Sequence, residues 1–490
     1  MAYLVGLDVG TTSSKAVVFD ERGAEVAHGR SRSSWHTADG RTEADPLQLL
    51  TSARHALRDA VRELPPGSVV AVGVASMGES GVLLDRGGEP TGPLIAWHDT
   101  RDESDVEDFA AEFGADEFAI RTGLPLRSQW SFTKHRWLNR HSESTAAAVR
   151  RLGVAEYVVR DLGGDEASEL SLASRTGWLD LTTRTWWEES LSWSGVTAGL
   201  LAPLVTAGTA LGTVTSPELP QLAGAVLTVA GHDHQAAAIG VGAIAAGNEL
   251  DSCGTAEAVI RTVAPGMATD EILALTRAGV TVGWHALAGH WCLLGGTQGG
   301  LVLSQLLGRL GVDRAGLAAL DAEALAAGSP AAGSPAAGTP SAGTAAAGTV
   351  IACTSLSITG DDNPVVHGAD DSTPAAVIWR AALEEVTARA YRIHSAMSAV
   401  TGPHNRFVAT GGWAHSAGLL EVKRRAFGPV LRSTVAEAGA RGAALLAGVA
   451  AGVYRDTAEA VSATAEAVSD TAEAVSATGE TASPRGDTTQ

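Results

Sequence analysis

Two stretches of this chain carry side chains that could do chemistry on a phosphate. Asp233 follows an apolar strand-like run that ends at Gly231, and a carboxylate on a turn after a strand is well placed to act as a general base. Residues 10–14 read Gly-Thr-Thr-Ser-Ser, a turn that offers consecutive backbone N–H groups and hydroxyls to an anion. Lys15 adds a positive charge, and Asp8 suits a Mg²⁺ ion that also contacts phosphate. The alternatives are a turn aspartate that satisfies local backbone groups and an ordinary hydroxyl-rich hairpin.

The first of these turns has an echo later in the chain. Residues 7–17 read Leu-Asp-Val-Gly-Thr-Thr-Ser-Ser-Lys-Ala-Val, and residues 250–259 read Leu-Asp-Ser-Cys-Gly-Thr-Ala-Glu-Ala-Val. Both are a strand that ends in Leu-Asp, a Gly-Thr turn and a new strand that ends in Ala-Val. The repeat predicts two copies of one supersecondary unit that face each other across a polyphosphate. Asp233 is then expected at the mouth of the cleft between two lobes.

A second group of polar side chains follows two predicted strands in the first half of the chain. A buried strand over 69–75 places Glu79 beyond its carboxyl end, where open α/β sheets bind ligands. A strand predicted over 93–101 ends in a polar cluster that includes Trp97 and Asp99. A sugar site needs carboxylates that accept hydroxyl hydrogen bonds and an aromatic face to cover the ring. The alternatives are a surface acid, a helix cap or arginine partner, and core packing.

A pair of glycines near the end of the chain has the pattern of a nucleotide site. Residues 407–409 are predicted as a strand, Gly411 and Gly412 follow it, and a helix is predicted over 417–427. This order brings backbone close to a ligand at a helix N-terminus, which suits an adenine nucleoside or its α-phosphate. The alternative is a tight connection between a strand and a helix.

Length and charge limit the class of protein. A chain of 490 residues is expected to form two domains, and its net charge of −20 argues against nucleic acid or an anionic membrane surface as a partner. Cys253, Cys292 and Cys353 lack zinc-ligand spacing and indicate buried apolar residues in a reducing compartment. We expect no signal peptide and no membrane span, and hence a cytoplasmic location.

The remaining chain predicts alternating strands and helices with two low-complexity segments. Strands are expected at 3–9, 15–20 and 25–28, and helices at 47–63, around 134–138, at 377–397 and at 436–452, the last rich in small residues that allow close packing. Trp186, Trp187 and Trp193 are expected to pack in a core, although one could line the cleft. Residues 326–348 repeat Ala, Gly and Pro and predict a flexible insert, and residues 456–490 predict a disordered or transiently helical acidic tail.

Taken in order, these motifs resemble the FGGY family of carbohydrate kinases. The resemblance covers residues 3 to about 453 and rests on the hairpin Asp8–Lys15, residues 73–101, Lys134-x-x-Trp137-Leu138, Gly231-x-Asp233, Gly254-Thr255 and Gly411-Gly412. It implies an α/β protein with the two-lobed actin-like ATPase fold, in which each lobe is an RNase H-like mixed sheet with helices. The N-terminal lobe would span 1–243 and the C-terminal lobe 244–455, which includes the insert, before the tail at 456–490.

The resemblance also implies roles for individual residues. Asp233 matches the catalytic base, and Asp8, with Asp233 beside it, matches the acids near Mg²⁺. The nucleotide-binding positions would be Gly10, Thr11, Thr12, Ser13, Lys15, Gly254, Thr255, Gly411, Gly412 and His415. The substrate-binding positions would be Met77, Glu79, Trp97, Asp99, Arg101 and His232.

The chain departs from the family pattern at two places. His232 and His234 flank Asp233 where many members carry Gly, Asn or Ala, and they could contact substrate hydroxyls or, as an alternative, a metal. Trp413 and His415 stand where a Gly and a Lys or Asn are common.

The expected function is transfer of the γ-phosphoryl group of ATP, with Mg²⁺, to a hydroxyl of a small ketose such as a xylulose-like pentulose. One alternative is a kinase for an erythritol- or glycerol-like polyol, which Glu79 favours because polyol kinases of the family place a substrate-binding Glu there. Another is a non-catalytic actin-fold regulator that binds ATP. A homodimer is compatible with the sequence, which identifies no interface.

Overall fold

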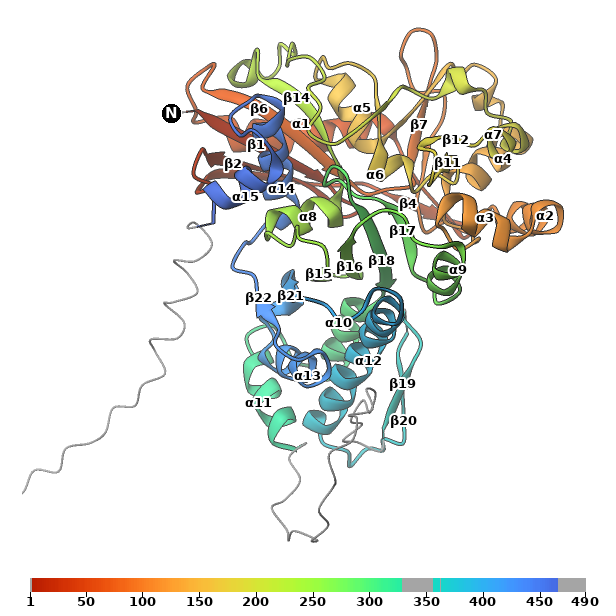
Figure 1. Cartoon of the computed structure of the whole chain (residues 1–490). Coiled ribbons are helices and arrows are strands. Elements are labelled where there is room, and N and C mark those ends of the chain that lie inside the picture. Colours follow the sequence, from red (N-terminus) through yellow and green to blue (C-terminus); the bar gives the residue numbers. More distant parts are fainter. Residues whose placement is uncertain (1, 328–355, 362, 466–490) are drawn as a thin grey trace, which may run out of the picture.

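The computed structural model describes residues 2–327, 356–361 and 363–465, which form two lobes (Figure 1). Each lobe is built on a mixed sheet with helices on its faces. Helix α11 (Leu317–Ala327) contains the first two residues of the predicted insert, and the rest of the insert lies outside the described residues, as does Cys353.

The first sheet has five strands in the order β14-β6-β1-β2-β3. Strands β1 (Tyr3–Val9), β2 (Ser13–Asp20) and β3 (Glu25–Arg32) form the antiparallel meander that the sequence predicts, and β3 is longer than predicted. Strands β6 (Val69–Ser76) and β14 (Val226–His232) run parallel to β1. β1 and β6 are almost continuously apolar because helices cover both faces of this part of the sheet.

Helix α1 (Pro46–Val61) covers one face of this sheet. Asp45 caps its N-terminus by accepting a hydrogen bond from the backbone N–H of Leu47, and Pro46 occupies the first helical position. Apolar residues at helical spacing, among them Leu50 and Leu57, are buried against β2 and β3. The predicted helix at 47–63 is thus confirmed.

Helix α14 (Ala438–Ala450) covers the opposite face of the first sheet, although it lies near the end of the chain (Figure 1). The contact is close because glycines face it. A Cβ added to Gly6 would lie 1.7 Å from the carbonyl oxygen of Ala440, and one added to Gly73 would lie 2.1 Å from that of Ala443. The predicted small-residue helix therefore packs closely, as expected, but on the N-terminal sheet.

The second sheet repeats the pattern of the first. Its order is β17-β18-β16-β15-β21-β22, where β15, β16 and β18 are antiparallel neighbours and β21 and β22 run parallel to β15. The strand bounds are β15 (Asn248–Cys253), β16 (Glu257–Val263), β17 (Thr281–Trp284), β18 (Trp291–Thr297), β21 (Arg406–Thr410) and β22 (Leu431–Arg432). The echo between residues 7–17 and 250–259 therefore marks two copies of one strand–turn–strand unit.

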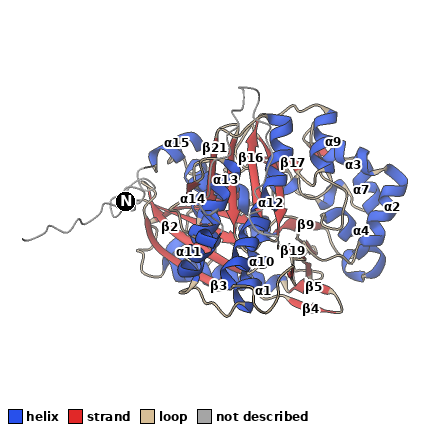
Figure 2. Cartoon of the chain, turned by 90° about the horizontal axis from the view of Figure 1, so that it is seen from below, coloured by secondary structure: helices blue, strands red, loops and turns tan. Residues whose placement is uncertain are grey.

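Helices cover the second sheet as well (Figure 2). They are α10 (Gly299–Arg309), α11, α12 (Ala375–Thr401) and α13 (Ala417–Phe427). The helix predicted over 417–427 has these bounds in the structure, and the one predicted over 377–397 is six residues longer. Trp379 and Phe407 are buried in the core between these helices and the sheet.

A helical extension between β7 (Gly81–Leu84) and β14 completes the first lobe. Its helices include α2 (Glu103–Phe113), α3 (Ala115–Thr122), α4 (Ser131–His141), α5 (Val154–Asp161) and α7 (Glu188–Ser194). An aromatic core holds them together, with Phe109 in ring contact with Phe132, Trp187 and Trp193. Trp187 and Trp193 are packing residues, as predicted, and Trp186 is half-buried.

Short elements fill the connections between these units. They are β4 (His36–Ala38), β5 (Arg41–Ala44), β8 (Leu94–Ile95), β9 (Arg150–Gly153), β10 (Ser168–Glu169), α6 (Leu170–Ala173), β11 (Leu179–Asp180), β12 (Thr185–Trp186), β13 (Leu204–Val205), α9 (Thr269–Arg277), β19 (Ser357–Thr359) and β20 (Val365–His367).

Two predictions about elements were wrong. The strand expected over 93–101 is only β8, because the backbone N–H of Asp99 donates to the carbonyl of Ala96 and turns the chain. The tail expected from residue 456 begins instead with helix α15 (Thr457–Ala463), which packs on α14 and buries Ala460. Arg441 of α14 donates to the carbonyl oxygen of Thr464 at 2.8 Å, which an unstructured tail could not provide. Residues 466–490 lie outside the described part.

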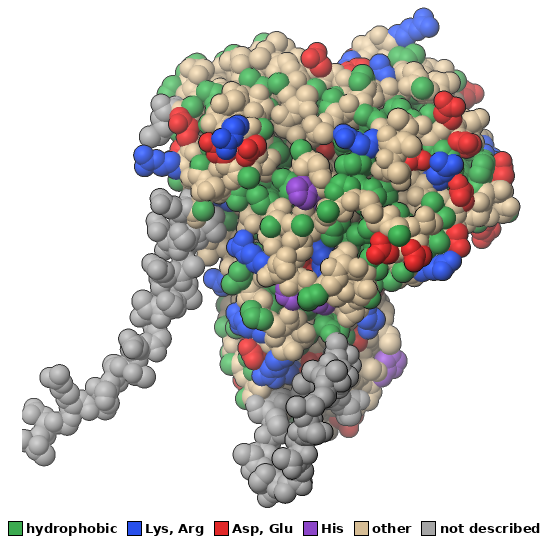
Figure 3. Space-filling view, in the orientation of Figure 1, with side chains coloured by type: hydrophobic (Ala, Val, Ile, Leu, Met, Phe, Trp, Pro, Cys, Tyr) green, Lys and Arg blue, Asp and Glu red, His purple; other side chains and the backbone are tan. Residues whose placement is uncertain are grey.

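Acidic and basic side chains are interspersed over the face shown in Figure 3. Among the described residues, no helix combines the length and apolar character required to cross a membrane.

Candidate active site

The first phosphate turn lies between β1 and β2. The backbone N–H of Gly10 donates to the carbonyl of Ser13 at 3.1 Å and closes the turn. The indole Nε1 of Trp35 donates to the carbonyl of Thr11 at 2.6 Å and holds the turn from the side. Thr12 is exposed, whereas Ser13 is buried with an Oγ that has no partner among the described residues. The structure thus forms the predicted turn, with Thr12 at its surface.

Asp8, near the end of β1, has a carboxylate that receives no hydrogen bond from any described residue, and its Oδ1 is buried. A Cβ added to Gly439 would lie 2.7 Å from Oδ2, so the start of α14 approaches the carboxylate closely. Burial and the nearby charge of Asp233 raise the pKa of Asp8 to about 7. A buried acid without donors beside a second acid fits Mg²⁺, because this ion takes one or two carboxylates together with phosphate oxygens.

Lys15, the predicted phosphate cation, is paired with an acid that the sequence analysis did not include. Its Nζ lies 2.8 Å from Oε2 of Glu437, and both side chains are partly accessible to solvent. Glu437 directly precedes α14, where the chain returns from β22 to the first sheet. A phosphate that binds Lys15 must therefore compete with Glu437.

Asp233, the predicted base, is the first residue of α8 (Asp233–Gly240) and follows β14 without an intervening turn. The bend is made within the strand at Gly231, whose φ is +88°. Oδ1 accepts the backbone N–H of His234 at 2.6 Å, and no described residue donates to Oδ2. Burial raises the pKa of Asp233 to about 7, and the charge of Glu79 contributes. Oδ1 thus accepts a backbone hydrogen bond, and Oδ2 is free to accept a proton.

His232 lies beneath the site and not at its surface. The ring is buried, and its Nδ1 is 3.2 Å from Oδ1 of Asp233. A Cβ added to Gly78 would lie 2.9 Å from the imidazole Cδ2. Burial lowers the pKa of His232 well below its usual range, so the ring is neutral. This position supports Asp233 and leaves little of the ring to contact a substrate.

Glu79 is held in a strained conformation beside this group. Its φ of +62° is rare for a residue with a side chain, and its carbonyl accepts hydrogen bonds from Ser131 Oγ at 2.5 Å and Arg151 at 3.1 Å. Oε1 accepts from Arg175 at 2.5 Å and from Gln129 at 3.0 Å. Oε2 has no donor among the described residues. Glu79 therefore offers one carboxylate oxygen to a hydroxyl.

Two predicted substrate residues meet the phosphate turn. The Thr11 hydroxyl donates to Sδ of Met77 at 3.7 Å and accepts a hydrogen bond from Nε1 of Trp97 at 3.1 Å. Residues from three separate parts of the sequence are thereby joined at one place. The predicted substrate region and the predicted phosphate turn are neighbours in the fold.

Asp99 and Arg101, also predicted to bind substrate, are occupied by the protein. Asp99 accepts the backbone N–H of Thr42 at 2.6 Å and the Nε and Nη2 groups of Arg101 at 2.8 Å. Arg101 also pairs with Glu43 at 2.5 Å, and its guanidinium lies 5.1 Å from the ring centre of Trp137. The arginine-partner alternative for Asp99 therefore describes the structure, and both side chains are almost fully buried, so their contact with a sugar stays a prediction.

The second phosphate turn and the glycine pair of the second lobe lie against each other. Gly411 has a φ of +93°, and a Cβ there would lie 2.7 Å from the carbonyl oxygen just before Gly254. A Cβ added to Gly300 would lie 1.8 Å from the carbonyl oxygen of Gly254 itself. Thr255 and Gly412 are exposed beside this junction. Three backbone segments thus pack directly against one another, a close approach that the glycines permit.

Of the two residues that depart from the family pattern here, one is in the core. Trp413 is buried and its ring lies 6.0 Å from that of Trp379. His415 is exposed at the end of a short 3-10 turn (Gly412–His415). His415 therefore remains accessible to a nucleotide, and Trp413 supports the turn from below.

Two buried clusters have the residue types of a metal site, but cations of the protein occupy both. Asp251 and Glu257 lie around Cys253, and the ammonium of Lys423 donates to both carboxylates. In the other, His394 and His404 lie near Glu249, which pairs with Arg261 at 2.6 Å. Within the described part of the chain, Asp8 and Asp233 are thus the better acids for a metal.

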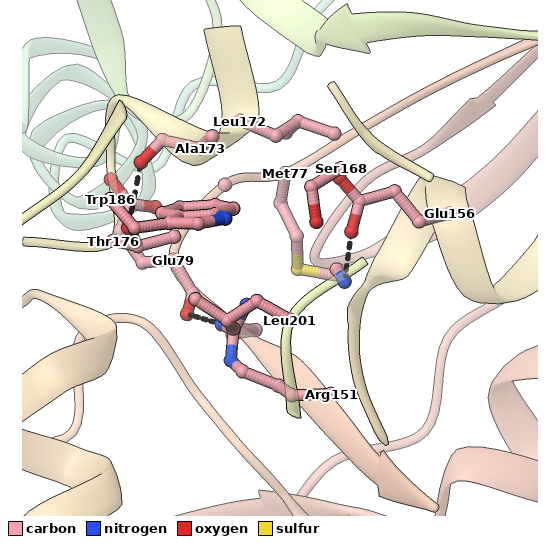
Figure 4. Close-up of a pocket in the computed structure, with 13 residues that line it drawn as sticks. Met77, Glu79, Arg151, Glu156, Ser168, Leu172, Ala173, Thr176, Trp186 and Leu201 are labelled. Atoms are coloured by element: carbon pink, nitrogen blue, oxygen red, sulfur yellow. Dashed lines mark hydrogen bonds between the residues drawn. The ribbon is translucent and has the colours of Figure 1, made fainter. Parts of the chain in front are cut away.

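A small pocket lies behind Glu79 (Figure 4). Its lining includes Met77, Arg151, Glu156 and Trp186, and it has space for about one water molecule. It is therefore too small for a sugar. Trp186 lines this pocket, and the alternative that one of the three tryptophans lines the cleft stays a prediction.

Sequence reasoning missed the partners of the predicted residues. Arg175 lies in a Ser-Arg-Thr stretch and Gln129 in an irregular loop, and neither has a local pattern that indicates a site. Glu437 could have been suspected, because it is the one acid in the small-residue helix predicted at 436–452. Lys423 and Arg175 are charged residues that only the tertiary structure reveals as buried.

Comparisons with known proteins agree with this arrangement. Residues 3–240 match the model of the N-terminal domain of the FGGY family of carbohydrate kinases. The gluconokinase of Bacillus subtilis is 28% identical over 478 residues, which cover 94% of this chain and 90% of that protein. A glycerol kinase of Methylobacterium radiotolerans is 31% identical over 267 residues, or 52% of each chain.

A solved structure shows the same fold. The ligand-bound xylulose kinase of Lactobacillus acidophilus superimposes with a TM-score of 0.80 at 21% identity, over 94% of this chain and 92% of that one. The predicted α/β fold with two actin-like lobes is thereby confirmed.

Proposed function

The chain belongs to the FGGY family of carbohydrate kinases, and we propose that Asp233 is the general base that activates a hydroxyl of its sugar or polyol substrate. The first candidate substrate is a small ketose such as a xylulose-like pentulose, and the second is an erythritol- or glycerol-like polyol, which the free Oε2 of Glu79 favours. Because the chain is a kinase, the alternative of a non-catalytic ATP-binding regulator is set aside.

The observation that carries the proposal is the state of the Asp233 carboxylate. Its Oδ2 has no donor among the described residues, and burial raises its pKa to about 7, so it has both room and affinity for a proton. It would take the proton of the acceptor hydroxyl as that oxygen bonds to the γ-phosphorus of ATP and the bond to the β-phosphate oxygen breaks. ADP then leaves with the bridging oxygen.

Other residues would position the nucleotide. Gly10, Thr11, Thr12 and Ser13 of the first turn and Gly254 and Thr255 of the second would hold the phosphates with backbone N–H groups and hydroxyls. Lys15 would exchange Glu437 for a phosphate oxygen, and Gly411, Gly412 and His415 would border the adenosine. Asp8 and Asp233 would hold Mg²⁺, which when bound neutralises the charge that develops on the phosphates.

The test is ADP release by the purified chain with Mg²⁺-ATP and a panel of ketoses, aldoses and linear polyols. One acceptor should raise ADP release above that with ATP alone. Asp233→Asn should lower turnover with that acceptor by roughly 10²–10⁴-fold, the usual contribution of a general base, with little change in the KM for ATP. Near-normal turnover in this variant would exclude Asp233 as the base.

A further inference from the structure

Arg127 carries a positive charge that no carboxylate neutralises in the described part of the chain. Its Nε donates to Oε1 of Gln129 at 2.8 Å, and its two terminal nitrogens have no hydrogen-bond or ion-pair partner among the described residues. The side chain is accessible to solvent, and the guanidinium lies 5.2 Å from the ring centre of the buried Trp130. Gln129 thus holds the Nε of Arg127, and the two terminal nitrogens are available to a ligand.

A second arginine lies near the same ring but is neutralised. The guanidinium of Arg175 is 5.3 Å from the ring centre of Trp130 and pairs with Glu79 at 2.5 Å. Part of the Arg127 side chain is accessible to solvent, but the surrounding protein desolvates its guanidinium, and this desolvation together with the charge of Arg175 lowers the pKa of Arg127 to about 10. Two guanidinium groups therefore share one carboxylate, and a site with this charge balance attracts an anion.

Arg127 is connected to the proposed catalytic group. Gln129 bridges Arg127 and Glu79 with hydrogen bonds of 2.8 and 3.0 Å, and the charge of Glu79 contributes to the raised pKa of Asp233. The loop that carries Arg127 starts at Gly123, whose carbonyl accepts the backbone N–H of Val282 in β17 at 2.7 Å. The loop that carries Arg127 therefore contacts the second lobe, and Gln129 joins Arg127 to Glu79.

We propose that Arg127 binds a carboxylate of the acceptor substrate, so that the acceptor is a polyhydroxy acid whose hydroxyl at the other end is phosphorylated. The inference rests on the proposed phosphotransfer and narrows the neutral acceptors considered there. The planar guanidinium can donate two parallel hydrogen bonds to a carboxylate. Because Gln129 holds Nε, both terminal nitrogens stay available for this contact. The free oxygen of Glu79 accepts a hydrogen bond from an acceptor hydroxyl that lies between the carboxylate and the hydroxyl to be phosphorylated.

A nucleotide phosphate would present similar chemistry to an arginine. The groups proposed for phosphate, however, lie on the turn around Thr12 and at Lys15, whereas the contacts of Arg127 are with Gln129 and Trp130 next to Glu79. We therefore assign the anion to the acceptor. The two sources differ in the substrate whose KM depends on Arg127.

The test uses matched acceptors that differ in one end group. Initial rates with Mg²⁺-ATP are measured for D-xylulose, xylitol and D-xylonate, and for D-fructose, D-glucitol and D-gluconate. The proteins are the full chain, Arg127→Gln, Arg127→Lys and, as a control for loss of an exposed positive charge, Arg86→Gln. We expect at least one acid to have a kcat/KM well above that of its neutral partners.

Arg127→Gln should raise the KM for that acid by about 10- to 100-fold, the effect of lost hydrogen bonds to a charged group, and leave kcat and the KM for ATP nearly unchanged. Arg127→Lys should recover part of the loss, and Arg86→Gln should behave as the unchanged chain. Calorimetric titration of the acid into Asp233→Asn should show binding that the double variant Asp233→Asn/Arg127→Gln loses, which measures the contact without catalysis.

The outcomes separate the two proposals. Preference for a neutral acceptor with no effect of Arg127→Gln overturns the carboxylate site and leaves the phosphotransfer standing. A rise in the KM for ATP alone assigns Arg127 to the nucleotide and also overturns it. If no acceptor of a broad panel raises ADP release in the unchanged chain, the proposed phosphotransfer fails and this inference fails with it.

Discussion

Asp8 and Asp233 show how single side chains depend on what lies next to them. The carboxylate of Asp8 has no hydrogen-bond donor among the described residues, and only one oxygen of Asp233 has one. The charge of Asp233 helps to raise the pKa of Asp8, so the two negative charges oppose each other. A divalent cation removes this repulsion, which is why we place Mg²⁺ there.

Asp8→Asn should raise the Mg²⁺ concentration required for half-maximal rate. Mutation of a residue that only hydrogen-bonds to a metal ligand lowers metal affinity by about 10–100-fold. Loss of a carboxylate that binds the metal itself should lower it at least as much. The measurement is the rate of ADP formation as Mg²⁺ is varied at fixed ATP. An unchanged Mg²⁺ dependence would remove Asp8 from the metal site.

Among the elements, the contact of β1 with α14 depends most on residue size. The helix can approach the strand only because Gly6 has no side chain, since a Cβ there would overlap the carbonyl oxygen of Ala440. The same contact brings Gly439 to Asp8 and Glu437 to Lys15. Packing between a strand and a distant helix therefore sets the geometry of the phosphate site.

Gly6→Ala should lower stability by roughly 3 kcal/mol or more, because backbone atoms must separate to admit the methyl group. Gly308→Ala is the matched control, since Gly308 lies in α10 with nothing within 4 Å of an added Cβ. It should stabilise the chain by up to about 1 kcal/mol. Thermal unfolding midpoints of the two variants should move in opposite directions, and equal shifts would contradict the packing argument.

The Asp99–Arg101 pair ties the turn after β8 to β5. Burial alone would raise the pKa of Asp99, but hydrogen bonds from Arg101 and Thr42 outweigh it and lower the pKa to about 2. Because the pKa of the folded state lies below that of the unfolded state, this stabilisation is full above pH about 4 and is lost as pH falls toward 2.

Asp99→Asn should therefore lower the free energy of unfolding by about 2 kcal/mol at pH 7, and the difference should shrink below pH about 4. Urea unfolding midpoints of the two proteins from pH 7 to pH 3 measure this. Activity per folded molecule should change little, because both side chains are committed to protein partners. A difference in midpoint that stays constant down to pH 3 would argue against the ion pair as its cause.

Local patterns predicted the elements better than the partners. Apolar runs and glycines were sufficient for β1, β2 and α13, because these elements are decided by neighbours in the sequence. Asp99 was predicted as a sugar ligand because the pattern shows its residue type but not Thr42, a donor 57 positions away. Arg175 and Glu437 were missed for the same reason. The predicted catalytic and nucleotide residues stay predictions until they are tested.

At the scale of the whole molecule, each lobe contains one copy of the same sheet unit, and the chain passes twice between the lobes. The first crossing runs from α8 to β15, and the second returns from β22 to α14. The division at residues 243 and 244 remains our proposal for the first boundary. The first lobe, however, also takes α14 and α15, so the lobes are not continuous in sequence (Figure 1).

Two truncated chains test the assignment of α15 to the first lobe. A chain that stops at Ala465 should keep the activity and unfolding midpoint of the full chain. A chain that stops at Asp456 loses α15. This exposes the part of α14 on which α15 packs, and it removes the two Thr464 oxygens that accept hydrogen bonds from Arg441. Its midpoint should fall by several degrees, as expected for loss of a packed element. Equal midpoints for the two truncations would show that α15 adds no stability.

The position of α14 also has a consequence for synthesis on the ribosome. The face of the first sheet that α14 covers, with Leu4, Val17 and Ala71, stays open until residue 450 has been made. At 5–20 residues per second, the interval between Ala71 and residue 450 is roughly 20–75 s, during which an apolar sheet face is exposed to other nascent chains. The N-terminal half expressed alone should therefore aggregate, and a nascent chain released before α14 emerges should be a client for chaperones.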